Sequence, residues 1–373
     1  MKRVAFLLAL AATLLLAVAA AAAPPPVDAD AYVVQNSGTG EVLAADDEHE
    51  HLPMASITKL MTAIVALEHA SLDDVATVSR STAAIGESTI NLVPGERVTL
   101  RDLIRAALIQ SANDAANAIA AFVGRGSVGR FVGLMNARAR QLGLADTHFV
   151  NPDGLDAPGH YSSAADVTKL ARVAMNKPFI RETVRFVTAT AAGRQLHTWN
   201  DLLSSFPNLI GVKTGHTDGA GWSQVAAARG GGVTIYATIL GGETRDGRNA
   251  DLSQLLVWGL SRYRTVWAID GERVYGTART AYGRDTVRLV AAKPALRVIH
   301  VERPLLERVV VPLEVALPVR QGQRLGEVQV LAGGTVIARS PLVAANSVEK
   351  PGAAGRVGFY AGRTLDHLGG LLG

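Results

Sequence analysis

Apolar positions along this chain recur at helical spacing in its first half and in short runs in its second half. The stretch Pro53–Leu67 begins with a proline and then carries apolar residues on every side. A helix that is apolar all round is normally buried at the centre of a domain, so this stretch predicts a central helix. Apolar and Ala-rich patterns predict four further helices, at 100–108, 115–121, 131–142 and 166–175.

Strands are expected on both sides of these helices. Alternation over 32–43 predicts a hairpin ahead of the central helix. Three consecutive apolar runs with turn residues between them predict an antiparallel sheet, at 208–217, 222–228 and 233–240. A helix at 250–263 is expected to pack on that sheet. The long polar loop 146–161 is expected to be ordered and functional, because it carries several apolar side chains.

After Trp267 the pattern changes to short Val-rich runs separated by Pro, Gly and charged residues, which predicts an all-β module. The expected fold class is therefore α+β, an antiparallel sheet packed with a helical cluster and followed by a small all-β domain. In the tail an apolar stripe through Val357 and Tyr360 favours an amphipathic helix on a membrane surface. Glycines weaken that helix, so a frayed end is the alternative.

The N-terminal residues predict the compartment. Lys2-Arg3 precede an apolar run from Val4 to about Ala20, followed by small residues and prolines. This pattern is typical of a secretory signal peptide cleaved within 19–23, and an uncleaved anchor is the alternative. The protein is expected in the periplasm or at the outer face of the cytoplasmic membrane. The expected organisation is a signal peptide at 1–23, a first domain at 24–266, the all-β domain at 267–348 and the tail at 349–373.

Composition excludes several classes of protein. Of the 373 residues 48% are hydrophobic and 19% charged, so the chain is not of the disordered class. The net charge of +4 is scattered without a dense basic block, so no nucleic-acid partner is expected. There are no cysteines, and stability must come from the core rather than from disulfides. The nine histidines show no His-x-x-x-His spacing, so no metal and no other cofactor is expected.

A serine and a lysine stand at the start of the central helix. Ser56 and Lys59 are three residues apart, which puts their side chains on one face. Burial would favour the neutral form of Lys59 and make it a proton acceptor, with Ser56 as the activated nucleophile. A helix cap and a solvated lysine would be the simpler interpretation. The same pattern recurs at Ser347–Lys350, but there it runs into Pro351 without an apolar helix behind it.

Three short motifs, each weak alone, together form the signature set of Ser/Lys acyl-transferases when they occur in this order. They are Ser56-Ile57-Thr58-Lys59, Ser111-Ala112-Asn113 and Lys213-Thr214-Gly215. With them the chain resembles the penicillin-binding proteins and serine β-lactamases, and within these the low-molecular-mass D-alanyl-D-alanine carboxypeptidases. The resemblance covers roughly residues 30–265 and implies a β-lactamase/transpeptidase-like domain. Longer stretches that carry it are 91–96, 111–115, 151–155, 159–162 and 213–217.

The resemblance implies a mechanism and a set of catalytic residues. Ser56 would attack the penultimate D-Ala carbonyl of a peptidoglycan stem peptide while Lys59 takes its proton. Ser111 would relay a proton to the departing D-Ala. Backbone N–H groups of Ser56 and His216 would hold the oxyanion, and water would then release the shortened peptide.

The resemblance also implies substrate-binding residues. Asn113 would bind the substrate amide, while Lys213 and Thr214 would bind its carboxylate. Gly215 would let the substrate approach the strand edge. Arg248, with Arg245 beside it, is a candidate for bidentate carboxylate binding, although a surface arginine is the simpler interpretation. A structural role is equally open for His216 and for His160, which would contact substrate or hold the polar loop in place.

Other activities of this fold remain as alternatives. A β-lactamase of the class that uses a glutamate would need one on the loop between the second and third motifs. The stretch 114–181 contains none, and Glu182 follows Pro178 near a helix start, off the loop. β-Lactam antibiotics should therefore acylate Ser56 and turn over slowly, as covalent inhibitors. D,D-endopeptidase and transpeptidase activity share the same acyl-enzyme. A non-catalytic cell-wall-binding or sensor protein is the alternative from a different class, which the three intact motifs disfavour.

Overall fold

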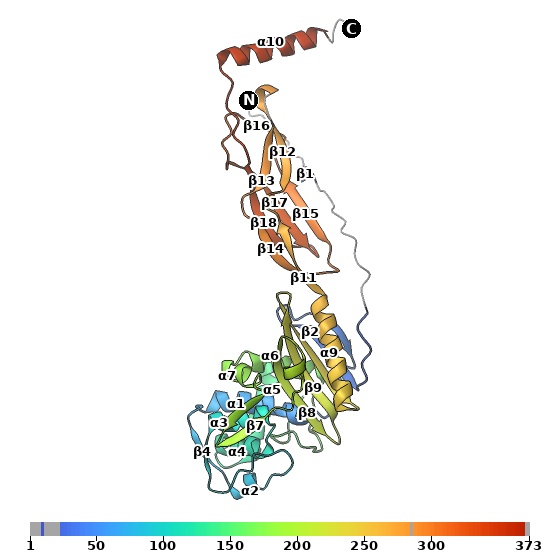
Figure 1. Ribbon diagram of the computed structural model, residues 1–373, viewed down its shortest axis with the longest axis vertical. Coiled ribbons are helices and arrows are strands. Elements are labelled where there is room, and N and C mark those ends of the chain that lie inside the picture. Colours follow the sequence, from blue (N-terminus) through green and yellow to red (C-terminus); the bar gives the residue numbers. More distant parts are fainter. Residues whose placement is uncertain (1–8, 11–22, 284–285, 370–373) are drawn as a thin grey trace. The chain divides into compact units, whose positions relative to one another are not determined.

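A computed structural model describes residues 9–10, 23–283 and 286–369 (Figure 1). The described residues separate into two compact units, Ala23–Ser261 and a second one formed by those from Arg262 onward together with Ala9–Leu10. We call them the mixed unit and the β unit. The boundary falls at 261/262 rather than at the expected 266/267, because β11 (Tyr263–Ile269) already pairs with β14 (Ala295–His300). Most of the expected signal peptide, and 370–373 of the tail, lie outside the described residues.

The mixed unit contains a five-stranded antiparallel sheet in the order β3-β2-β10-β9-β8. Its strands are β2 (Ala31–Asn36), β3 (Val42–Asp46), β8 (Leu209–Thr217), β9 (Gly221–Gly230) and β10 (Val233–Gly242). The expected hairpin and the expected three-stranded run are both present. They join through the pairing of β2 with β10, so the N-terminal hairpin completes the sheet and β8 remains its edge strand.

Alternating residues of these strands face two different layers. Val34 and Ile235 meet Gly259 of α9 (Arg245–Ser261), which covers one face of the sheet. On the other face Thr238 bonds to Thr168 of α6 (Ala164–Met175), which belongs to the helical cluster. The sheet is therefore buried on both sides, which explains why its strands read as almost continuous apolar runs.

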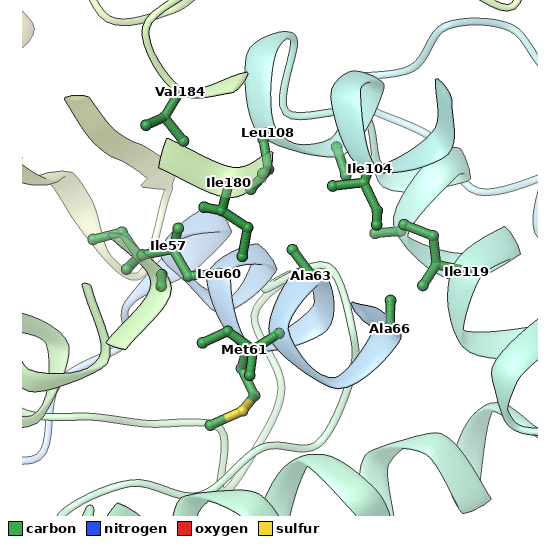
Figure 2. Close-up of a cluster of buried hydrophobic side chains, with 14 of the residues drawn as sticks. Ile57, Leu60, Met61, Ala63, Ala66, Ile104, Leu108, Ile119, Ile180 and Val184 are labelled. Atoms are coloured by element: carbon green, nitrogen blue, oxygen red, sulfur yellow. The ribbon is translucent and has the colours of Figure 1, made fainter. Parts of the chain in front are cut away.

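The helical cluster surrounds the short helix η1 (Ala55–Thr58) and α1 (Lys59–His69), as Figure 2 shows. Every residue of α1 from Lys59 to Ala66 is buried. The other helices of the cluster are α2 (Arg80–Ala83), α3 (Leu100–Ile109), α4 (Asn113–Val123), α5 (Val128–Leu142), α7 (Pro178–Thr183) and α8 (Leu202–Ser205). Side chains of α3, α4 and α7 close around α1, which makes it the predicted central helix.

Local chemistry fixes where several of these helices begin and end. The side chains of Thr99, Ser127 and Ser163 accept the backbone N–H bonds that begin α3, α5 and α6. Gly143 ends α5 in the left-handed conformation, as its sequence position predicted.

Other boundaries differ from the expected ones. The helix expected at 115–121 begins at Asn113, and α9 begins at Arg245 rather than at 250. The short helices α2 and α8 were not predicted. Neither were two antiparallel strand pairs, β4 (Val75–Thr77) with β5 (Arg97–Thr99) and β6 (Thr188–Ala191) with β7 (Arg194–His197).

The β unit has its own core of Val, Leu and Ala side chains. Its larger sheet has the order β1-β15-β17-β18-β13-β12-β16, and β11 pairs with β14 beside it. The strands of the larger sheet are β1 (Ala9–Leu10), β12 (Val274–Thr280), β13 (Val287–Ala291), β15 (Leu305–Val310), β16 (Glu314–Val315), β17 (Arg324–Ala332) and β18 (Thr335–Ala344). The short helix η2 (Ala281–Gly283) follows β12.

The tail forms the helix α10 (Ala353–Gly369) rather than an irregular end. Val357 and Tyr360 are exposed on it, and Tyr360 and Phe359 contact Tyr282 of η2 edge to face. No single described helix is long and apolar enough to cross a membrane. The pair α4 and α5 reaches the required length together, but it bends by 89° at the junction, and α4 is mostly buried core.

Candidate active site

The three sequence motifs meet at one pocket of about 270 Å³ in the mixed unit. Ser56 comes from η1, Ser111 from the turn between α3 and α4, and Asn113 from the first residue of α4. Thr214 and Gly215 come from the edge strand β8. These residues are separated by up to 159 positions in the sequence, from 56 to 215. The packing of α1 against α3 and α4, and of β8 against η1, is what brings them together.

Ser56 and Lys59 are in direct contact. The Lys59 Nζ lies 2.6 Å from Ser56 Oγ, and it also bonds to Asn113 Oδ1 at 2.7 Å and to the Asp153 carbonyl oxygen at 2.6 Å. The last two groups can only accept hydrogen bonds. When Lys59 is neutral, its two remaining hydrogens stay with these acceptors and its lone pair faces the Ser56 hydroxyl. The surroundings of Lys59 therefore direct proton transfer toward Ser56.

Burial makes the neutral form of Lys59 accessible. The side chain is completely buried, and this desolvation lowers the pKa of Lys59 to about 8, partly opposed by the negative charges of Asp153, Glu87 and Asp114. At neutral pH about one molecule in ten then has an unprotonated lysine. The expected activation of Ser56 by a desolvated lysine agrees with this geometry.

Two glycines enclose the backbone of the nucleophile. A Cβ on Gly154, whose φ is +90°, would stand 1.9 Å from the Ala55 carbonyl oxygen, and a Cβ on Gly215 would stand 2.8 Å from the Met54 carbonyl oxygen. Ala55 itself has a φ of +48°, a conformation that non-glycine residues rarely adopt. Gly215 was expected to make room for substrate. The close contact is with η1, so the glycine is required by the protein's own packing.

Ser111 and Lys213 form a second pair. The Lys213 Nζ donates to Ser111 Oγ at 3.0 Å and to the Thr214 carbonyl oxygen at 2.8 Å. Burial, and then the positive charges of Lys59 and Arg248, hold the pKa of Lys213 well below its usual range. Ser111 was expected between the two lysines, and its bond is to Lys213, while Asn113 bonds to Lys59. A bound carboxylate would favour the charged form of Lys213.

The remaining expected residues lie around the same pocket. His216 is exposed at the wall, with its ring 4.0 Å from that of Trp222. Arg248 is 2% exposed, lines the pocket and bonds to Asn249 Oδ1, and burial lowers its pKa to about 10. Arg245 is held by a bidentate bond to Asp201. Arg248 is therefore the arginine of this pair whose charge has no carboxylate partner among the residues that the structure describes.

His160 is buried and hydrogen-bonded through both ring nitrogens. Its Nδ1 accepts the Val150 N–H at 3.0 Å, so its Nε2 carries the proton and donates to Thr58 Oγ1 at 2.8 Å. Burial lowers the pKa of His160 to about 4, which keeps the ring neutral. It joins the polar loop to η1 next to the nucleophile. The loop is ordered, as expected, and its Gly154 and Leu155 line the pocket.

Some residues of the pocket were not expected from the sequence. Trp199 lines the pocket and donates its indole N–H to the Gln110 carbonyl oxygen, and the Trp222 ring contacts that of His216 at a tilt of 32°. Glu87, which also lines the pocket, comes from an irregular segment before β5. None of these belongs to a recurring motif, so nothing in the pattern of one sequence distinguishes them.

A serine with a buried lysine as its base, in a pocket between a helical cluster and a sheet edge, defines a serine enzyme of the acyl-transfer class. Comparison with known proteins makes this more specific. Residues 18–244 match the family model described as D-alanyl-D-alanine carboxypeptidase, and residues 263–350 match that of the penicillin-binding protein 5 C-terminal domain. The chain therefore belongs to the D-alanyl-D-alanine carboxypeptidase family.

Known proteins are similar to this chain over most of its length. It is 34% identical over 355 residues to the D-alanyl-D-alanine carboxypeptidase DacD of Salmonella typhimurium, covering 90% of each chain. The crystal structure of penicillin binding protein 6B from Escherichia coli is 30% identical with a TM-score of 0.64, covering 87% of this chain and 98% of that one. The Streptomyces K15 DD-transpeptidase structure is 32% identical with a TM-score of 0.62, covering 64% and 100%.

These matches support one of the readings that the sequence left open. The protein is a serine D-alanyl-D-alanine carboxypeptidase, a hydrolase of the penicillin-binding group, rather than a β-lactamase or a non-catalytic wall-binding protein. The expected fold, a β-lactamase/transpeptidase-like α+β domain followed by an all-β domain, is confirmed.

Proposed function

We propose that this protein removes the terminal D-Ala of peptidoglycan stem peptides through an acyl-enzyme on Ser56, with Lys59 as the general base. The observation that carries the proposal is the 2.6 Å contact between Lys59 Nζ and Ser56 Oγ while Asn113 and Asp153 hold the other two hydrogen-bonding directions of the amine. The base thus faces the hydroxyl that it deprotonates before any substrate arrives.

The attack requires a site for the negative charge that develops on the carbonyl oxygen. We assign this to the backbone N–H groups of Ser56 and His216. Support comes from the packing of β8 on η1, which is so close that a Cβ on Gly215 would lie 3.2 Å from the Ser56 nitrogen. The two N–H groups belong to segments that cannot move apart without breaking this contact.

The departing D-Ala carries both a nitrogen that needs a proton and a free carboxylate. Ser111 is the proposed proton donor to that nitrogen, since its hydroxyl bonds to Lys213 and can be reprotonated by it. The proposed carboxylate site consists of Thr214 and Arg248, which line the pocket, and Lys213, whose Nζ bonds to the Thr214 carbonyl oxygen. Asn113 is the proposed contact for the substrate amide.

Water then hydrolyses the acyl-enzyme and releases the shortened stem peptide. Penicillin should acylate the same Ser56 hydroxyl and form an ester there. No glutamate occurs in 114–181, the stretch where a β-lactamase of the glutamate-dependent class would have one, so we propose that this adduct is long-lived.

The test is release of D-Ala from a pentapeptide stem by the wild type and by Lys59→Ala and Lys213→Ala. Loss of release in both is expected, and unchanged release in both would discard the mechanism. Intact mass after benzylpenicillin gives an independent reading. One adduct in the wild type and none in Ser56→Ala is expected, and an adduct that persists in Ser56→Ala would exclude Ser56 as the nucleophile.

We further propose the order signal peptide, catalytic domain, β domain and C-terminal anchor, with the enzyme exported and acting at the outer face of the cytoplasmic membrane. The Lys2-Arg3 and apolar run support export. Exposed Val357 and Tyr360 on α10 support the membrane contact. Cosedimentation of the full chain with vesicles containing anionic lipid should fall in the double variant Val357→Asp and Tyr360→Asp. Equal binding by both proteins would refute the anchor.

A further inference from the structure

Glu87 stands out because it is the only acidic side chain among the described residues that line the pocket. The charged side chains that share the wall with it are Arg245 and Arg248. Arg245 and Arg248 lie on α9, and Glu87 follows α2 in the chain. The pocket therefore carries cationic groups from α9 and an anionic group from a different segment.

The backbone around Glu87 is held in place by the active site itself. Asn113 donates its side-chain N–H to the Gly86 carbonyl oxygen at 3.1 Å and its backbone N–H to the Ser88 carbonyl oxygen at 2.7 Å. The same side chain accepts the bond from Lys59. Glu87 lies between these two contacts with a φ of +63°, an uncommon conformation for glutamate that such contacts must stabilise. Its position is thus linked to that of the general base.

The carboxylate of Glu87 has no hydrogen bond or ion pair to any of the residues that the structure describes, and it is exposed to the pocket opening. Glu96, nine positions later, shows the usual alternative, because Arg194 binds both of its oxygens at 2.6 and 2.9 Å. Arg245 is likewise neutralised by Asp201. Glu87 and Arg248 are the two pocket charges left without an opposite charge, and they differ in sign.

We infer that Glu87 selects stem peptides that carry a free ammonium group on the side chain of the residue preceding the D-Ala pair. The inference rests on the proposed function. Arg248 and its neighbours would bind the terminal carboxylate, and Glu87 would pair with a cation farther along the same peptide. Glu87 is a specificity residue in this proposal and takes no part in bond making or breaking. A peptide whose ammonium is already acylated, as in a cross-link, would lose this contact.

The test uses the full-length enzyme and three tripeptides that end in D-Ala-D-Ala. Their first residue is lysine with a free, an acetylated or a succinylated side-chain nitrogen, which gives a positive, a neutral or a negative group at one place. The wild type should show kcat/KM highest for the free and lowest for the succinylated peptide, with about two- to fivefold between free and acetylated. Most of the difference should lie in KM, and it should shrink as salt rises from about 0.05 to about 1 M.

Variants separate this role from a structural one. Glu87→Gln, and Glu87→Asn, which suits the positive φ, should reduce the free-to-acetylated ratio to about one, and Glu87→Lys should invert the order of the free and succinylated peptides. Glu50→Gln, an exposed acid outside the pocket, should keep the wild-type ratio. Ratios are used because Glu87 also influences the pKa of Lys59, which changes all three rates together.

Two outcomes would overturn the inference. One is a wild type that releases D-Ala equally fast from the free and acetylated peptides, and the other is a preference that survives in Glu87→Gln and Glu87→Asn. Either result leaves the proposed function intact. Failure of the proposed function would look different, since the wild type would then release no D-Ala from any of the three peptides.

Discussion

The chain contains the pattern Ser-x-x-Lys twice, once in each unit. Ser56 and Lys59 lie in the centre of the mixed unit, in contact with each other, and Lys59 is completely buried. Ser347 and Lys350 lie on an exposed segment after β18, where Ser347 accepts the Gln321 N–H at 2.9 Å and Lys350 precedes a proline. Identical residue types at identical spacing thus give a nucleophile and base in one place and two exposed side chains in the other.

This comparison shows that the reactivity of a Ser-x-x-Lys pair depends more on the desolvation of its lysine than on the spacing of the two residues. An exposed lysine keeps its proton at neutral pH, because water solvates the charge, whereas burial lowers the pKa of Lys59 to about 8. The two units differ in the same way as a whole. The described core of the mixed unit contains Lys59, Lys213, Arg248 and His160, while the buried polar side chains described in the β unit are Thr280 and Ser340. The unit that carries the reaction is the one that buries ionisable groups.

The largest expected effect comes from replacing Lys59, and the same replacement of Lys350 is the control. Lys59→Met keeps the volume of the side chain but removes the base, so the rate of Ser56 acylation by benzylpenicillin should fall by about a thousandfold or more. Lys350→Met should acylate at the wild-type rate. Rapid-quench mass spectrometry measures both, and a Lys59→Met enzyme that keeps more than about a tenth of the rate would contradict the role of the base.

The next effect concerns the glycines that enclose Ser56. Gly154→Ala places a Cβ 1.9 Å from the Ala55 carbonyl oxygen, so we expect a loss of more than about 3 kcal/mol in the free energy of unfolding and of most acylation. Gly193→Ala is the matched control, because Gly193 also has a positive φ, +71°, but nothing within 4 Å. It should lose only about 1 kcal/mol in urea denaturation. Equal losses in the two variants would mean that backbone conformation alone is responsible.

The pH dependence of stability tests the contact between His160 and η1. Folding lowers the pKa of His160 from 6.5 to about 4, so between these values the unfolded chain binds more protons. The stabilisation is complete above about pH 6.5 and is lost as pH falls toward 4, by roughly 3 kcal/mol. His160→Gln should flatten this part of the curve, and His69→Gln, at an exposed helix end, should not. A curve of unchanged slope in His160→Gln would show that other groups cause it.

The smallest expected effect is the pH dependence of acylation. Since attack requires neutral Lys59 and burial lowers its pKa to about 8, the acylation rate should rise about tenfold between about pH 7 and about pH 9 and then level off. Lys350→Met should show the same profile. A flat profile over this range would mean that the proton leaves Ser56 by another route.

Much of this site could be predicted from the sequence because its parts lie in motifs with regular surroundings. The apolar pattern around Lys59 predicted the burial that lowers its pKa, and the turn residues of 208–240 predicted the edge strand that carries Thr214. What could not be predicted depends on tertiary packing. Nothing near Gly154 in the sequence indicates that it touches Ala55, and the motif around Gly215 does not indicate that this glycine also packs against the backbone of η1.

Other parts of the fold could not be predicted because contacts with residues distant in the chain determine their conformation. The short hairpin β6–β7 has few apolar residues to form a pattern, and it is stabilised by packing on α3 rather than by propensity. Glu87 lies in an irregular segment whose conformation is set by Asn113, a residue distant in the chain. Its importance becomes visible only once the pocket is assembled.

The close packing of Gly154 and Gly215 on Ala55 and Ser56 has a consequence for how the protein matures. Three chain segments must dock before Ser56 has a fixed backbone and a base beside it, and the last of them, β8, enters only after more than two hundred residues have been made. An incompletely folded chain carries an ordinary, unreactive hydroxyl. Covalent labelling by a fluorescent penicillin therefore counts only the molecules that have completed folding, and it can serve as a conformational probe during export and refolding.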